Sequence, residues 1–171
     1  WAALIGDPQH PLQDRVSLSK FAPGSVFKVV MAIAALEEGV ATPARIDHCN
    51  GSYRFGERTF QCWGIRKGGH GAIGMRDAII HSCNVYFYRL GNDLGIERIA
   101  KWSHLLGFGQ PTGIDLPHEE GGTVPDPEWK RRAVPRDPAW HPGETISVSI
   151  GQGALEVTPL QMAMFAATIG S

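Results

Sequence analysis

The segment that most constrains the fold is PGSVFKVVMAIAALEEGV, residues 23–40. Its apolar side chains recur at positions 26, 29, 30, 33 and 36, a spacing typical of a helix that packs one face into a core. A Pro-Gly pair precedes this run and Gly39 follows it, as is common at helix ends. The sequence therefore predicts a buried helix with Ser25 at its start and Lys28 in its first turn.

The rest of the chain is predicted from the same kind of pattern. Further helices are expected over residues 75–82, 85–95 and 96–109, and from Thr158 onward. Residues 145–153 alternate between apolar and polar types, which predicts a strand that runs into a glycine turn. The segment 41–74 is predicted as an irregular excursion, either a loop or a small hairpin subdomain, and the segment 109–145 as loop. The chain should thus form a helical cluster with few strands.

Length and charge limit what the chain can be. Its 171 residues suffice for one domain, and no stretch approaches the ~20 apolar residues of a membrane-spanning helix. A formal net charge of -1 argues against nucleic acid as a partner, because phosphate binding needs a surplus of basic side chains. The chain starts at Trp1 and stops inside a helical pattern, so we expect residues 1–171 to be part of a domain truncated at both ends.

Ser25 and Lys28 have the spacing of a serine nucleophile and its base. Residues three apart share a helix face, so the lysine amine can reach the serine hydroxyl. Burial and the positive end of the helix dipole both favour a neutral lysine, which can take the hydroxyl proton. The alternative is an ordinary helix-capping Ser25 with Lys28 extended to solvent. The pattern alone is weak, because Ser17 and Lys20 repeat it outside any predicted helix.

A second pair of polar residues strengthens this hypothesis. Ser82 and Asn84 flank Cys83 at the break between two predicted helices, so both side chains can point into one cleft. The hydroxyl can relay a proton between Lys28 and a leaving amine, and the amide can hold a peptide carbonyl. Helix capping by Ser82 is the alternative.

Longer stretches of the sequence are similar to a known family. They are FAPGSVFKVVMAIAALEEGV, GGHG, SCNVYFYRLGNDLGIERI, LLGFGQPTGIDLPHEEGG, EWK and TISVSIGQGALEVTPLQMA. With Ser-x-x-Lys and Ser-x-Asn, they resemble the class B penicillin-binding proteins, and among these the penicillin-binding protein 2 group. The resemblance runs from about residue 11 to residue 171. It implies an α/β fold of the penicillin-binding-protein/serine β-lactamase-like transpeptidase type, here mainly its helical part with an incomplete antiparallel sheet.

The resemblance also implies an activity. Family members are peptidoglycan D,D-transpeptidases, in which Ser25 would be the acylated nucleophile, Lys28 its base, Ser82 the proton relay and Asn84 the amide that positions substrate. The substrates would be stem peptides ending in D-Ala-D-Ala, cross-linked during cell-wall elongation, and β-lactam antibiotics would acylate the same serine. The acyl transfer itself would need no cofactor. Several relatives have Asp where this chain has Asn84.

One element of the family pattern is absent, since no Lys-Thr-Gly or Lys-Ser-Gly occurs in residues 1–171. In the family this tripeptide lies on a strand that forms a wall of the site and part of the oxyanion hole. We therefore expect the parent protein to be active and the isolated fragment inactive. Two other functions are open: a serine β-lactamase, for which only Glu119 and Glu120 could activate water, and a non-catalytic β-lactam sensor or binding domain.

Three cysteines and a histidine form a second candidate site. These residues are Cys49, Cys62, His70 and Cys83. Three thiolates and an imidazole are a suitable donor set for a closed tetrahedral zinc site, and the resemblance adds weight because some relatives bind zinc at corresponding positions. The alternatives are a Cys49–Cys62 disulfide, which a periplasmic location permits, and free thiols. A zinc ion would tie the segment 41–74 to the loop that bears Ser82.

The resemblance implies a location and partners as well. Family members act on the periplasmic face of the bacterial inner membrane, anchored by an N-terminal helix that is not among residues 1–171. They work with the cell-elongation machinery, including a glycosyltransferase. Both points are expectations drawn from the resemblance alone.

Overall fold

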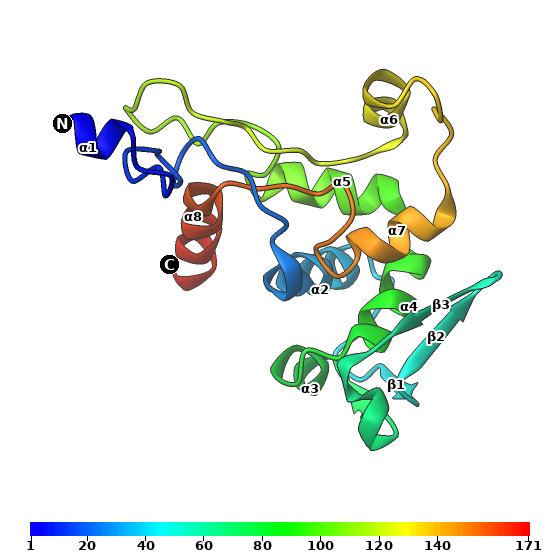
Figure 1. Cartoon of the computed structure of the whole chain (residues 1–171). Coiled ribbons are helices and arrows are strands. Elements are labelled where there is room, and N and C mark those ends of the chain that lie inside the picture. Colours follow the sequence, from blue (N-terminus) through cyan, green and yellow to red (C-terminus); the bar gives the residue numbers. More distant parts are fainter.

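The computed structural model describes residues 1–171 as helices joined by long loops and a few short strands (Figure 1). The helices are α1 (Ala2–Ile5), α2 (Lys28–Glu37), α3 (Met75–Ile80), α4 (Asn84–Leu94), α5 (Ile96–Leu105), α6 (Pro127–Ala133), α7 (Pro142–Val148) and α8 (Pro159–Gly170). The 3₁₀ turns are η1 (Gly24–Phe27) and η2 (Trp63–Lys67). The strands are β1 (Ile46–Cys49), β2 (Ser52–Phe55), β3 (Arg58–Gln61) and β4 (Gly71–Gly74). None of the helices combines the length and the apolar character needed to cross a membrane.

The core is built around α2, which packs against α3, α4 and α5. Val30, Met31, Ala34 and Ala35 of α2 are completely buried. The neighbouring helix α4 contributes buried apolar side chains along most of its length. The apolar run of residues 23–40 therefore contains the central helix of the structure, but the expected core face is wrong. Of positions 26, 29, 30, 33 and 36 only Val30 is buried, whereas Val26 and Leu36 are exposed. Val26 lies in the 3₁₀ turn η1, whose tighter winding takes it out of the α-helical spacing.

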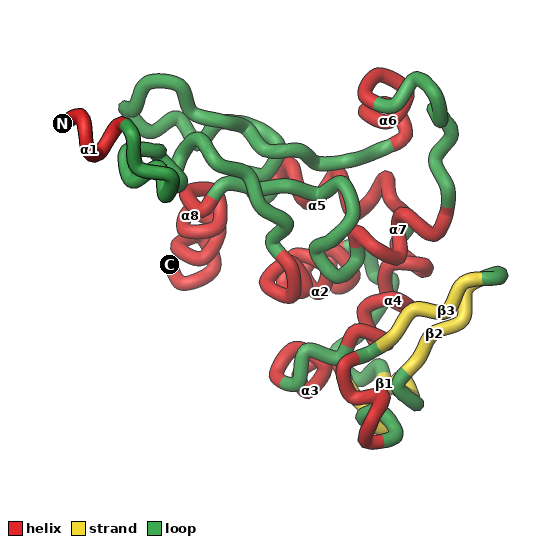
Figure 2. Tube along the Cα trace, viewed as in Figure 1, coloured by secondary structure: helices red, strands yellow, loops and turns green.

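The segment 41–74 forms two antiparallel pairs of strands. β1 pairs with β4, from Ile46 opposite Gly74 to Cys49 opposite Gly71. β2 and β3 form a hairpin that projects away from the helices (Figures 1 and 2). The small-hairpin alternative for this segment is confirmed.

The strand predicted at 145–153 is wrong, because this segment begins inside α7. Pro142 is the first residue of α7, and the Glu144 carboxylate accepts a hydrogen bond from the backbone N–H of His141 (2.8 Å). These helix-start signals outweigh an apolar alternation only a few residues long. The glycine turn after it is present, with Gly151 at a φ of 73°.

The loop that the sequence predicts over residues 109–145 is wrong in part, because helix α6 lies within this segment. The Asp126 carboxylate accepts a hydrogen bond from the backbone N–H of Trp129 (2.6 Å), and Pro127 is the first helical residue. Asp followed by Pro is a helix-start signal, so this element was detectable from the sequence.

The helix predicted after Thr158 is confirmed as α8. Thr158 Oγ1 accepts a hydrogen bond from the backbone of Gln161 (3.1 Å), and Gln161 Oε1 accepts one from the backbone of Thr158 (2.9 Å). Just before α8, Val157 forms an antiparallel bridge with Phe21, four residues before Ser25. This bridge fixes the path along which the chain enters η1.

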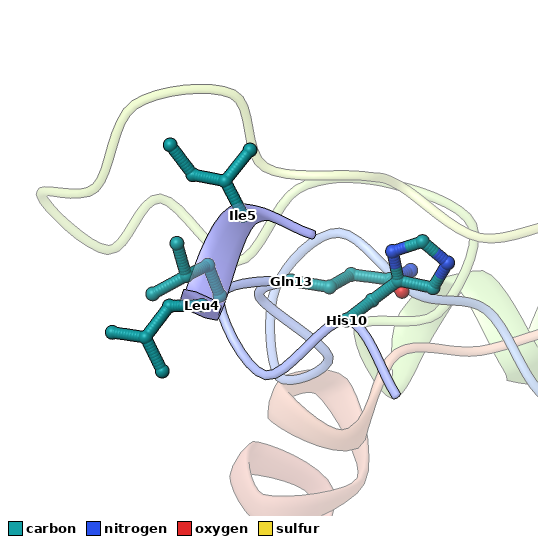
Figure 3. Close-up of a pocket in the computed structure, with 5 residues that line it drawn as sticks. Leu4, Ile5, His10 and Gln13 are labelled. Atoms are coloured by element: carbon teal, nitrogen blue, oxygen red, sulfur yellow. The ribbon is translucent and has the colours of Figure 1, made fainter. Parts of the chain in front are cut away.

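A cavity near the N-terminus lies apart from the candidate residues. Its volume is about 400 Å³, and its lining comes entirely from the first turns of the chain (Figure 3). The lining residues are Leu4, Ile5, His10, Leu12 and Gln13. No candidate catalytic or metal-binding side chain reaches this cavity.

Candidate active site and metal centre

Lys28 is the central residue of the candidate active site, and it is only 1% exposed. Its Nζ lies within hydrogen-bonding distance of Ser25 Oγ (3.1 Å), Ser82 Oγ (2.8 Å), the Ser82 carbonyl (3.0 Å) and Asn84 Oδ1 (2.6 Å). Burial lowers the pKa of Lys28 to about 8 and outweighs the opposing charges of nearby cysteines. The alternative of a lysine extended to solvent is therefore wrong.

Ser25 lies within η1, where its side chain makes no capping hydrogen bond. The helix-cap alternative for this residue is wrong as well. Its hydroxyl is exposed and accepts hydrogen bonds from Lys28 Nζ and from Ser82 Oγ (2.7 Å). An exposed hydroxyl next to a buried amine is the arrangement that a nucleophile and its base require.

Ser82 lies on the short connection between α3 and α4, in a strained backbone conformation. Its φ is 49°, in the left-handed region that residues other than glycine seldom adopt. In this conformation both its hydroxyl and its carbonyl oxygen face Lys28 Nζ. The strain therefore coincides with the placement of two hydrogen-bonding groups against the same amine.

Asn84 is the first residue of α4, and its side-chain amide has one defined orientation. Its Oδ1 accepts from Lys28, while its Nδ2 donates to the backbone carbonyl of Gln61 at the end of β3 (3.3 Å). The Tyr88 hydroxyl donates to the same carbonyl (3.1 Å). The Gln61 carbonyl accepts but cannot donate, so it holds the amide with its oxygen toward Lys28.

The oxygens around Lys28 Nζ accommodate the neutral amine that a general base must be. A neutral amine has two N–H groups and one lone pair. The Asn84 amide oxygen and the Ser82 carbonyl oxygen can only accept, so they can take both N–H groups. In the neutral state the lone pair is then left to accept a hydrogen bond from a hydroxyl, that of Ser25 or Ser82, whereas the charged amine donates to these oxygens.

The four candidate metal ligands also come together. The ligand atoms of Cys49, Cys62, His70 and Cys83 all lie within 4.8 Å of one another. His70 Nδ1 is 3.5 Å from Cys49 Sγ and 3.6 Å from Cys62 Sγ. Bond lengths of about 2.3 Å for Zn–S and about 2.0 Å for Zn–N give a tetrahedral S–N edge of about 3.5 Å. The donor geometry therefore fits a zinc ion.

The thiols of this cluster differ in their electrostatic surroundings. Burial raises the pKa of the Cys83 thiol to about 12, so a thiolate there needs a neighbouring cation. Burial also acts to raise the pKa of Cys62, but backbone N–H groups, including those of Asn84 and Val85 at the start of α4, lower it overall. All three cysteines are free and buried.

Comparison with known proteins identifies the family. The sequence model of the penicillin binding protein transpeptidase domain matches residues 2–171. The chain belongs to the penicillin-binding protein transpeptidase family.

Relatives of this family agree in sequence and in fold. Peptidoglycan D,D-transpeptidase MrdA of Acinetobacter baumannii is 42% identical over 96% of this chain, and MrdA of Escherichia coli K12 is 35% identical over 95% of it. These matches cover 24% and 25% of the relatives, so the chain spans about a quarter of their length. The resemblance to the penicillin-binding protein 2 group is confirmed.

Solved structures of the same group confirm the fold class. PBP2 of Pseudomonas aeruginosa, in its complex with WCK 5153, has a TM-score of 0.93 and 35% identity. That match covers 98% of this chain and 36% of the other. PBP2 of Helicobacter pylori gives a TM-score of 0.93 at 34% identity, over 100% of this chain and 32% of the other.

Two contributors to this transpeptidase-family site were not found from the sequence. Gln61 acts through its backbone carbonyl, which no side-chain pattern reveals. Tyr88 lies one helical turn after Asn84, and this spacing could have placed it on the same helix face.

Proposed function

We propose that the parent protein is a peptidoglycan D,D-transpeptidase with Ser25 as its acylated nucleophile. One observation carries the proposal: the buried amine of Lys28 contacts Ser25 Oγ, Ser82 Oγ and Asn84 Oδ1 at 3.1, 2.8 and 2.6 Å. Formation of a covalent benzylpenicillin adduct on Ser25 tests it. The relatives named as D,D-transpeptidases support the choice of reaction.

Acylation begins with neutral Lys28, which takes the proton of the Ser25 hydroxyl. The Ser25 oxygen then attacks the carbonyl carbon between the two terminal D-alanines, and Asn84 orients the peptide. When the C–N bond breaks, the terminal D-alanine leaves as an amine, with the proton returned from Lys28 through the Ser82 hydroxyl (2.7 Å from Ser25 Oγ). The product is an ester between Ser25 and the shortened stem peptide.

The second half-reaction restores the serine. An amine from a neighbouring stem peptide attacks the ester carbonyl and loses a proton through Ser82 to Lys28. The Ser25 oxygen leaves with that proton, and a new amide bond joins the two strands. A β-lactam is attacked in the same way, but its amine remains tethered to the acyl group and blocks the second attack.

The β-lactamase alternative requires a base that activates water for deacylation, and Glu119 and Glu120 are the candidates for it. The Glu119 carboxylate instead accepts hydrogen bonds from the backbone of Thr112 and Gly113 (2.7 and 3.1 Å), and Glu120 pairs with Lys20 (3.4 Å). Neither hydrogen-bonds to the Lys28 network. The benzylpenicillin adduct is therefore expected to be long-lived. Assays of the cross-linked peptidoglycan product distinguish a transpeptidase from a non-catalytic sensor.

The rate of acylation should rise with pH, with its midpoint at about 8, the value to which burial lowers the pKa of Lys28. The sign follows from the mechanism, because only neutral Lys28 can accept the proton and the neutral fraction grows as pH rises through the pKa. Acylation of the full-length protein by benzylpenicillin, followed across this range, measures the midpoint. A midpoint at the ordinary lysine value of 10.5 would contradict the proposed environment.

Residues 1–171 alone should not acylate. The family places a Lys-Thr-Gly or Lys-Ser-Gly strand beside the nucleophile, and this segment contains neither tripeptide. Loss of one oxyanion-hole donor typically costs about 2.7–4 kcal/mol of transition-state stabilisation. Equal acylation rates for the fragment and the full-length protein would refute this point.

We also propose that the protein acts on the periplasmic face of the inner membrane, held there by an N-terminal helix that is not among residues 1–171. The proposed substrate supports this location, because peptidoglycan is assembled there. A structural relative, PBP2 from Helicobacter pylori, is in complex with MreC, and another, 38% identical, belongs to a peptidoglycan synthase complex that coordinates polymerisation and crosslinking. Elongation proteins, including a glycosyltransferase, are therefore the partners that we propose.

A structural zinc ion is the second proposal for this chain. The S–N distances of 3.5 and 3.6 Å and the closed set of three sulfurs and one nitrogen support it. Zinc would neutralise the buried thiolates and would join β1, the end of β3 and the start of α4. Because Cys83 lies between Ser82 and Asn84, such a centre would stiffen the loop that carries both.

A further inference from the structure

The turn after α7 makes a very close backbone contact with the residue before Ser25. Gly24 donates its backbone N–H to the carbonyl of Gly151 (2.9 Å). This N–H lies at the start of η1, where no helical acceptor is available to it. A Cβ on Gly151 would lie 2.1 Å from the Gly24 oxygen and 2.7 Å from its nitrogen, so this position has no room for a side chain.

The same segment also packs against the helix that begins with Asn84. α7 contacts α4, where a Cβ on Gly91 would lie 2.4 Å from Ser149 Cβ. The absence of a side chain at Gly91 is therefore what allows the end of α7 to approach α4. Residues 142–153 thus touch the two elements that carry Ser25 and Asn84.

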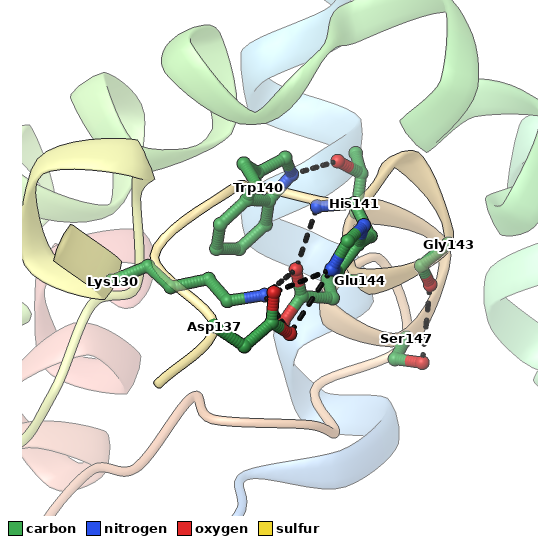
Figure 4. A network of polar contacts seen from close by, with 8 residues as sticks. Lys130, Asp137, Trp140, His141, Gly143, Glu144 and Ser147 are labelled. Atoms are coloured by element: carbon green, nitrogen blue, oxygen red, sulfur yellow. Dashed lines mark hydrogen bonds and ion pairs between the residues drawn. The ribbon is translucent and has the colours of Figure 1, made fainter. Parts of the chain in front are cut away.

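The start of α7 is held by an ion-pair network around the buried amine of Lys130 (Figure 4). Lys130, whose side chain is 4% exposed, donates to Glu144 Oε2 (2.6 Å) and to Asp137 Oδ2 (3.3 Å). Burial acts to lower the pKa of Lys130, but its hydrogen bonds to both carboxylates raise it overall, so the amine stays charged. Glu144 Oε2 also accepts from the His141 backbone, so Lys130 fixes the first turn of α7.

We propose that residues 142–153 are a positioning element for acylation, anchored by Lys130 at one end and by the Gly151–Gly24 contact at the other. This inference rests on the proposed role of Ser25. The segment holds the start of η1 in place, which sets the position of Ser25 Oγ relative to Lys28 Nζ (3.1 Å). Misplacement of a nucleophile by about 1 Å can lower a rate by about 100-fold, so this contact matters to the chemistry.

A matched pair of glycine substitutions in the full-length protein tests the proposal. Gly151 and Gly153 have φ values of 73° and 77°, so alanine adds similar backbone strain at each. A Cβ on Gly153 would lie 3.4 Å from Ser147 Cβ, an ordinary contact, whereas one on Gly151 would collide with Gly24. Only Gly151→Ala should therefore displace the nucleophile.

We expect Gly151→Ala to lower the rate constant of acylation by benzylpenicillin by about 100-fold and to leave the affinity of the non-covalent complex nearly unchanged. Gly153→Ala should acylate at close to the rate of the unmodified protein. Equal decreases of the acylation rate constant in the two variants would overturn the inference. It would also be overturned if Gly151→Ala weakened only the affinity of the non-covalent complex and left the rate constant unchanged.

If Gly151→Ala does not fold, Lys130→Met tests the positioning role of residues 142–153 in its place. It removes the anchor of α7 without altering η1, and Lys101→Met, which removes an exposed lysine paired with Glu38, is its control. A lower acylation rate constant in Lys130→Met alone supports the inference, and equal rate constants overturn it.

Ser25→Ala separates the positioning role from the proposed function, because an adduct that survives in this variant would overturn the role of Ser25 itself.

Discussion

Replacing Lys28 by Met in the full-length protein should lower the rate constant of acylation by benzylpenicillin by about 10²–10⁴-fold, the usual contribution of a general base. Methionine is unbranched and apolar, so it can occupy the buried site of Lys28 without leaving a charge in the core. The thermal midpoint should stay the same or rise, because a buried amine is costly. Stopped-flow acylation and thermal unfolding measure the two effects.

Lys20→Met is the matched control for this substitution. Ser17 and Lys20 repeat the Ser-x-x-Lys spacing, but Lys20 pairs with Glu120 (3.4 Å) outside the site. Lys20→Met should therefore acylate normally. If Lys28→Met also acylated at the rate of the unmodified protein, another group would have to be the base.

Replacing His70 by Ala should release the proposed zinc ion. We expect the full-length protein to bind about one zinc per chain and the variant to bind it at least about 100-fold more weakly, because a tetrahedral site loses one of its ligands. The variant should also unfold at a lower temperature, since structural zinc contributes directly to folding free energy. Metal analysis and a chelator titration followed by calorimetry provide the readouts.

His48→Ala is the control, because His48 is exposed on β1 next to Cys49 and is not part of the cluster. It should retain zinc and stability. A Cys49–Cys62 disulfide found by peptide mapping, with less than about half an equivalent of zinc, would contradict the metal centre. Equal zinc affinity in both histidine variants would contradict the role of His70.

The candidate residues were predictable because short-range spacing or chemistry marks each of them. Ser25 and Lys28 lie one helical turn apart in an apolar run, so their contact follows from helix geometry. Ser82 was detectable because a break between two helices exposes its loop. The donor types of the metal ligands mark them in the sequence, and the antiparallel β1–β4 pairing brings Cys49 close to His70.

Two long-range contacts of the site were not predictable, because backbone carbonyls make them. The Gln61 carbonyl that orients Asn84, and the Gly151 carbonyl that accepts from Gly24, leave no side-chain signature. The strand expected at 145–153 failed for a different reason. Its few alternating residues are a weaker signal than the start signal at Pro142, which begins a helix.

The most direct test of the central claim is the intact mass of the full-length protein after mixing with benzylpenicillin, followed in time. Ser25→Ala is compared with Ser17→Ala, which removes the serine of the second Ser-x-x-Lys pattern. The account predicts a long-lived adduct of one benzylpenicillin per chain, mapped to the Ser25 peptide, present in Ser17→Ala and absent in Ser25→Ala. An adduct that persists in Ser25→Ala, or none in the unmodified protein, would contradict Ser25 as the nucleophile.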